Sequence, residues 1–128
     1  MTSVALYAPP EYVLAKPAVR AAVVNGCGPR GWKGELIPDT IWGLNIREAC
    51  NIHDWMYAAG STIADKEEAD RVFLNNMLRL ITAAGGLGAL RWLRRQRASR
   101  YYEAVCLFGG PAFWGGKNPA QTLRMVLA

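Results

Sequence analysis

Glycine and proline divide residues 45–111 of this 128-residue chain into three stretches with helical periodicity. Gly60 ends the first stretch, Gly85-Gly86 ends the second, and Gly109-Gly110-Pro111 ends the third, because glycine and proline interrupt helices. Only a short turn separates the first two stretches, so we expect their helices to pack antiparallel. The sequence therefore predicts an all-α chain, in which a third and strongly basic helix runs from Leu87 to Leu107.

The segments before these helices are less regular. Asn45 and Asp65 can cap the first and second helices, each with a glutamate three residues further on. Residues 25–44 hold six glycines or prolines within their first fourteen positions, a composition typical of a loop, and long loops in compact domains are usually functional. Residues 1–24 mix proline with valine and alanine, and strands there remain an alternative to helix.

Length and charge limit the classes of protein that this chain can be. We interpret residues 1–128 as a single domain. The net charge of +5 favours anionic partners, either nucleic acid or a phosphate-rich membrane surface. The sequence has neither a membrane-spanning segment nor a secretory signal, so we expect the protein to be cytoplasmic as synthesised, or exported by another route. Its three cysteines are too few for a disulfide scaffold.

Two ionisable residues lie on the apolar stripes of the first two helices. His53, the one histidine, is in line with Cys50 and Tyr57, and Asp70 is in line with Phe73 on the partner helix. Their heights above the turn, ~10 Å and ~7.5 Å, differ by roughly 3 Å at a rise of ~1.5 Å per residue. We therefore expect a hydrogen bond between them, which either serves catalysis or satisfies a core histidine.

Asp54 follows His53 and points toward one edge of the buried stripe, roughly 100° round the helix. If Cys27 bonds Cys50, the glycine-rich loop is tethered near this carboxylate. A carboxylate and backbone carbonyls are the oxygen ligands that calcium prefers. The plainer alternatives are an exposed helical carboxylate and two buried thiols.

Three motifs resemble those of the phospholipase A2 family. Residues 50–57, CNIHDWMY, resemble its active-site helix, whose core is C-x-x-H-D-x-x-Y, and residues 25–31, NGCGPRG, resemble its calcium loop. Residues 69–73, ADRVF, resemble the A-D-x-x-F element of the second helix, which is especially clear in parvoviral capsid phospholipases. The motifs occur in the order of the family, within residues 25–81. The short gap between histidine and aspartate is closer to compact microbial and viral members than to animal secreted enzymes.

The resemblance implies calcium-dependent hydrolysis of the sn-2 ester of phospholipids. By this resemblance, His53 is the general base that takes a proton from the attacking water. Asp70 would orient the histidine, as the acidic member of a triad does. Tyr57 would hydrogen-bond Asp70 and steady the network.

The same resemblance implies a calcium (Ca2+) site that acts as a Lewis acid on the ester. It would be formed by the Asp54 carboxylate and by loop carbonyls, for which the positions carried over are Gly26, Gly28 and Arg30. A Cys27–Cys50 disulfide would anchor this loop. Here the loop is longer than in the secreted enzymes, and Pro29-Arg30 interrupts its glycine pattern.

The third predicted helix carries five arginines in residues 91–100, RWLRRQRASR. Such a segment suits an anionic phospholipid surface, with contacts from Arg91, Trp92, Arg94 and Arg95, and it is equally compatible with a solvated helix face. Nucleic acid is the weaker alternative, because it leaves the histidine and the aspartates unexplained, so no nucleic-acid partner is expected. The main alternative to an enzyme is a catalytically silent, phospholipase A2-like structural or membrane-binding module.

Overall fold

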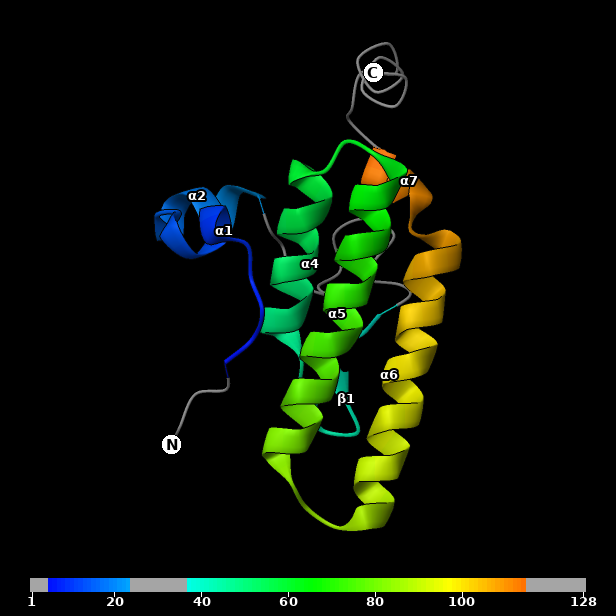
Figure 1. Ribbon diagram of the computed structural model, residues 1–128. Coiled ribbons are helices and arrows are strands. Elements are labelled where there is room, and N and C mark those ends of the chain that lie inside the picture. Colours follow the sequence, from blue (N-terminus) through cyan, green and yellow to red (C-terminus); the bar gives the residue numbers. More distant parts are fainter. Residues whose placement is uncertain (1–4, 24–36, 115–128) are drawn as a thin grey trace.

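The computed structural model describes residues 5–23 and 37–114, and this part of the chain is mostly helical (Figure 1). The elements, in order, are α1 (Pro10–Leu14), α2 (Pro17–Val23), β1 (Thr40–Ile41), β2 (Leu44–Asn45), α4 (Arg47–Ala59), α5 (Ile63–Ala84), α6 (Gly88–Phe108) and α7 (Gly110–Trp114). No helix among the described residues is long and apolar enough to cross a membrane.

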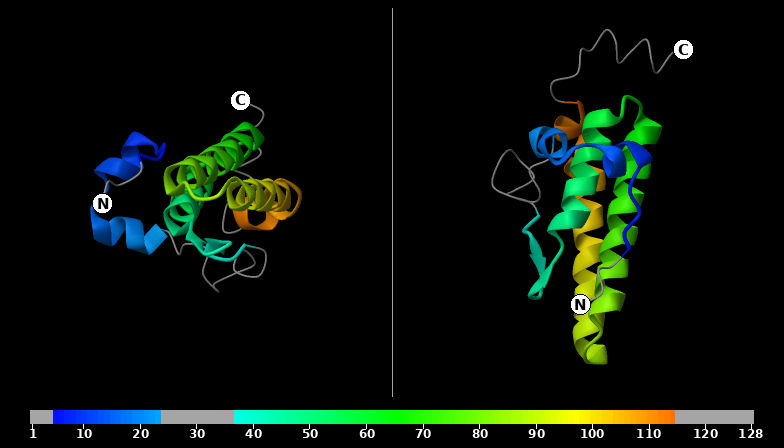
Figure 2. Two further views of the ribbon diagram at one scale, coloured as in Figure 1. Left: turned by 90° about the horizontal axis from the view of Figure 1, so that it is seen from below. Right: turned by 90° about the vertical axis from the view of Figure 1, so that its left-hand side faces the viewer.

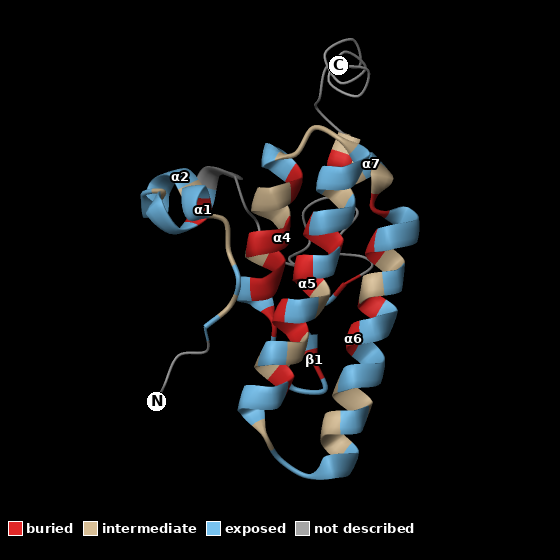
Figure 3. Ribbon diagram, viewed as in Figure 1, coloured by how far each residue is buried: buried red, intermediate tan, exposed pale blue. Residues whose placement is uncertain are grey.

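Helices α4, α5 and α6 run side by side and reverse direction at each connection, with α5 in contact with both neighbours (Figures 1 and 2). Gly60 and Gly85 occupy the C-cap positions of α4 and α5, as the sequence predicts. The buried residues lie along the facing sides of these helices (Figure 3). The largest cluster of buried side chains includes Ile46, Cys50, Phe73, Met77, Ile81 and Val105.

The expectation of an all-α chain holds in its coarse form, with one exception. Strands β1 and β2 pair antiparallel, with Thr40 opposite Asn45. Trp42 (φ 45°) and Gly43 (φ 79°) form the turn, because a tight two-residue hairpin takes positive φ at both central residues. Strands were the alternative expected for the first 24 residues. None occurs within residues 5–23, which contain α1 and α2.

Both predicted helix caps are displaced. Ile46 rather than Asn45 is the N-cap of α4, although Asn45 Oδ1 still accepts the backbone N–H of Arg47 at 2.8 Å. Thr62 rather than Asp65 is the N-cap of α5, and Asp65 is the third helical residue of a reciprocal capping box. The helix therefore begins before Asp65, because the threonine hydroxyl accepts the backbone N–H of Asp65 at 3.1 Å.

Candidate functional site

The expected hydrogen bond between α4 and α5 is present. His53 Nε2 lies 2.8 Å from Asp70 Oδ1, and both side chains are almost completely buried. The helical spacing places each residue on the face that its helix turns toward the other. The geometric prediction is confirmed, whereas the catalytic role of the pair stays a prediction.

Asp70 receives three hydrogen bonds. Its Oδ1 atom accepts from His53 and from the Tyr57 hydroxyl at 2.7 Å, and its Oδ2 atom accepts from Lys66 Nζ at 2.8 Å. Burial alone would raise the pKa of Asp70, but the hydrogen bonds from His53, Lys66 and Tyr57 outweigh it and hold the pKa below its usual value. The carboxylate is therefore kept ionised in the interior.

Aromatic contacts hold the His53 ring in place. Its centroid lies 4.1 Å from the ring of Tyr57 and 4.7 Å from that of Phe73. Because Nε2 faces an ionised carboxylate, the neutral imidazole carries its proton there, which leaves the lone pair on Nδ1. Burial, together with donation to Asp70, raises the pKa of the Tyr57 hydroxyl, which therefore stays protonated as a donor.

Lys66 is a member of this network that motif reading missed. Its ammonium bonds Asp70 and also donates to the backbone carbonyl of Val105 at 3.0 Å. The position of Lys66, four residues before Asp70 on α5, is a signal that helix geometry could have used, since such residues are neighbours on one face. The contact with Val105 needed α6 to be in place.

The junction between α6 and α7 covers the network. A β-carbon at Gly109 would collide with the Tyr57 hydroxyl and with the carbonyl of Val105. Phe113 of α7 packs edge-on against Tyr57, with ring centroids 5.2 Å apart. The lack of a side chain at Gly109 therefore lets the end of α6 approach the site.

The predicted calcium site is only partly within the described residues. Asp54 is half-buried on α4, directly after His53. Gly26, Gly28 and Arg30 lie outside the described residues. No group of three or more histidine, cysteine or acidic side chains able to hold a metal occurs in residues 5–23 and 37–114. A site of one carboxylate and loop carbonyls does not require such a group.

The remaining predicted residues are Cys50 and those of the basic helix. Cys50 is completely buried and disulfide-bonded, but the expected partner, Cys27, lies outside the described residues, so their pairing stays a prediction. On α6, Trp92 and Arg95 are exposed, whereas Arg91 and Arg94 are half-buried. The half-buried Arg94 donates to the carbonyl of Trp42 at 3.0 Å, so part of the basic face packs on the β1–β2 turn.

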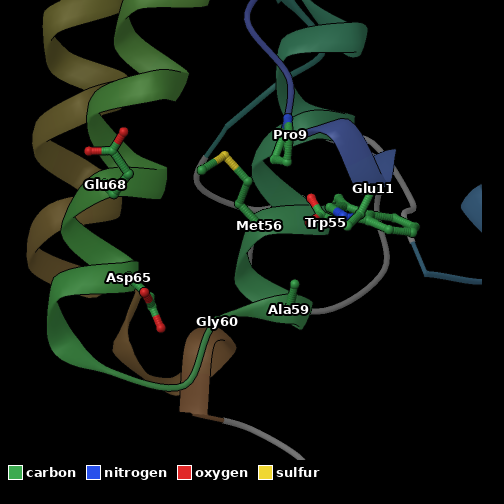
Figure 4. A pocket seen from close by; sticks show the side chains of 8 residues that line it. All are labelled: Pro9, Glu11, Trp55, Met56, Ala59, Gly60, Asp65 and Glu68. Carbon is green, nitrogen blue, oxygen red and sulfur yellow. The ribbon is translucent and has the colours of Figure 1, made fainter. Parts of the chain in front are cut away.

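A separate pocket of about 430 Å³ lies between α1, α4 and α5 (Figure 4). Pro9, Glu11, Trp55 and Met56 contribute to its lining, and His53 and Asp70 do not. This pocket is therefore distinct from the buried network.

Comparisons of the chain with protein-family models, with curated proteins and with solved structures found no match. The assignment of a function therefore depends on the geometry of the site and on the sequence motifs.

Proposed function

We propose that this chain is a calcium-dependent phospholipase A2-like hydrolase, which cleaves the sn-2 ester of phospholipids with a water activated by His53. The observation that carries the proposal is the buried hydrogen bond of 2.8 Å between His53 and Asp70, with the Tyr57 hydroxyl on the same carboxylate oxygen. Motifs that resemble the family supply the reaction class. The antiparallel hairpin of α4 and α5 is the element that would carry the active site.

In this reaction His53 Nδ1 takes the proton of the attacking water, and the water oxygen forms a bond to the sn-2 carbonyl carbon. Asp70 holds the proton on Nε2 and stabilises the imidazolium that forms. When the tetrahedral intermediate collapses, the imidazolium returns a proton to the departing alkoxide oxygen. The residues thus supply a base, an orienting group and a proton donor, and no covalent intermediate is needed.

The resemblance proposes four residues to hold a calcium ion, of which the structure describes Asp54. Asp54 provides a carboxylate directly after the base, and the remaining ligands would be the carbonyls of Gly26, Gly28 and Arg30. The hard oxygen donors of this set suit calcium better than a softer metal. When bound, the ion would supply positive charge that stabilises the oxyanion.

An anionic phospholipid surface is the proposed partner. The exposed basic residues of α6, together with Trp92, which is 60% exposed, suit contact with lipid phosphate. The net charge of +5 acts in the same direction.

The test is fatty-acid release from sn-2-labelled phospholipid vesicles, measured with calcium and with a chelator. We expect release that needs calcium and that is abolished in His53→Gln and in Asp54→Lys. Glu67→Lys, the same charge change at an exposed position of α5, is the matched control and should keep the wild-type rate. Wild-type turnover in folded His53→Gln would refute the mechanism.

One observation favours the alternative of a silent membrane-binding module. His53 is 0% exposed, as a purely structural core histidine would be, whereas a base must meet water. This alternative predicts vesicle binding without fatty-acid release, from protein whose helical circular dichroism is intact. Calcium-dependent release would exclude it.

A further inference from the structure

The ammonium group of Lys66 lies between the Asp70 carboxylate and the C-terminal end of α6. It is 2.8 Å from Asp70 Oδ2, 3.0 Å from the Val105 carbonyl oxygen and 3.5 Å from that of Cys106. The Lys66 side chain is only 13% exposed. A lysine with three acceptors from two helices is unlike the solvated lysines of a helix surface.

A cation is needed at this point for an electrostatic reason. The last carbonyls of a helix carry partial negative charge, equivalent to roughly half an elementary charge at the helix end. Asp70 adds a full negative charge next to them, in an interior where repulsion is weakly screened. An ammonium group has three N–H donors and no acceptor, so Lys66 can bond the carboxylate and the carbonyls at once.

We propose that Lys66 is a positioning residue, which holds Asp70 in the orientation that directs Oδ1 at His53. The carboxylate has two oxygens, and Lys66 takes Oδ2 while His53 and Tyr57 share Oδ1. Rotation of the carboxylate would break the contacts at both oxygens. Lys66 therefore anchors the orienting carboxylate to the end of α6, and its effect on turnover, though not on the histidine itself, rests on the proposed function.

The close contact at Gly109 supports this arrangement independently. Because Gly109 has no side chain, the end of α6 lies against the Tyr57 hydroxyl, which is the other donor to Asp70. The end of α6 thus meets the network through Lys66 and again through Tyr57. A displacement of α6 would therefore disturb the contacts of Asp70 with both Lys66 and Tyr57.

The test uses the fact that the chain has one histidine, so its imidazole nitrogen signals need no assignment. We compare wild type with Lys66→Met, which nearly keeps the length of the side chain and removes its charge. The measurement is nitrogen-15 NMR at a pH where the imidazole ring is neutral. We expect one tautomer, protonated at Nε2, in wild type and a mixture in Lys66→Met. Arg71→Met, which breaks an exposed ion pair on the same helix, is the control and should match wild type.

If the chain hydrolyses phospholipid, Lys66→Met should lower kcat by up to roughly 100-fold, the effect of a catalytic group displaced by about 1 Å, with little change in KM. Lys66→Arg, which keeps the charge, should recover part of the loss. A folded Lys66→Met protein with wild-type histidine signals would overturn the proposal. Lack of hydrolysis in wild type, with the tautomer change still present, would refute the proposed function and leave the positioning role intact.

Lys66→Met could fail to fold, and the double variant Lys66→Met/Asp70→Asn covers that case. Removing the carboxylate charge removes the need for the cation, so we expect the double variant to be folded. If it also fails to fold, Lys66 acts only on the carbonyls of α6, and the positioning role is overturned.

Discussion

Helix α5 carries two ion pairs of nearly equal length in very different surroundings. Lys66 and Asp70 are 2.8 Å apart with side chains 13% and 2% exposed, whereas Arg71 and Glu68 are 2.9 Å apart with side chains 55% and 51% exposed. Water screens the second pair, and exposed pairs contribute little to stability. We therefore expect burial, rather than distance, to decide how much each ion pair contributes to stability.

The two pairs also differ in what depends on them. Asp70 is hydrogen-bonded to His53 and Tyr57 of α4, and Lys66 is hydrogen-bonded to the Val105 carbonyl of α6. The exposed pair joins positions three residues apart on one helix. The buried pair therefore connects three helices, whereas the exposed pair lies within one.

Removing the buried carboxylate should have the largest effect. Asp70→Ala leaves the Lys66 ammonium buried without its counter-charge, and loss of one partner of a buried pair typically costs about 3–5 kcal/mol. We expect the free energy of unfolding in urea to fall by about that amount. A loss as small as that of an exposed pair would contradict the role of burial.

Gly109→Ala should have the next largest effect. We expect it to lower the free energy of unfolding by about 1–3 kcal/mol, the usual cost of overpacking a core. Gly109 has helical φ and ψ of −76° and −12°, so alanine suits its backbone, and any loss must come from contact with Tyr57 and Val105. Thermal unfolding measures it. Gly88→Ala is the control, because a β-carbon there meets nothing within 4 Å, and an equal loss in both variants would point to a backbone cause.

Tyr57→Phe should lower the free energy of unfolding by about 1 kcal/mol, the net value of one hydrogen bond. The loss is small because Asp70 keeps its hydrogen bonds from His53 and Lys66. Fatty-acid release should fall less than in Asp70→Ala. The urea midpoint and the vesicle assay check the two parts. If Tyr57→Phe matched Asp70→Ala in either measurement, the hydroxyl would be more than a supporting donor.

Acid should weaken the fold through Asp70. Its pKa is lowered in the folded state from the ordinary value of 3.8, so between the two values the unfolded chain binds more protons. The stabilisation is present above pH 3.8 and is lost as the pH falls through the folded pKa. From about pH 5 to 2, the free energy of unfolding in urea should decline less steeply in Asp70→Asn than in wild type. The part of the decline that is due to Asp65, whose pKa is also lowered, should remain.

Breaking the exposed pair should have the smallest effect. We expect Arg71→Met to leave the urea midpoint and the rate of fatty-acid release unchanged, because water already solvates both partners. A loss comparable to that of Lys66→Met would remove the distinction between the two pairs.

Much of the fold was predictable because its causes are local. Gly60 and the Gly85-Gly86 pair end helices through their own backbone properties, and the apolar spacing of α4 and α5 placed His53 and Asp70 on facing sides. The caps were displaced for a reason that is also local but subtler. Thr62 competes with Asp65 for the start of α5, and the two share one capping box.

The sequence by itself determined the helix-forming segments, the facing of His53 and Asp70, and the chemistry that their motifs resemble, since periodicity and helix breakers act within a few residues. Only the tertiary structure decided that Lys66 turns inward and that Gly109 must lack a side chain. Both depend on where the end of α6 lies, some 40 residues from Lys66 along the chain. No local pattern predicts where the end of α6 lies relative to Lys66, because that position results from packing α6 against α5 as a whole.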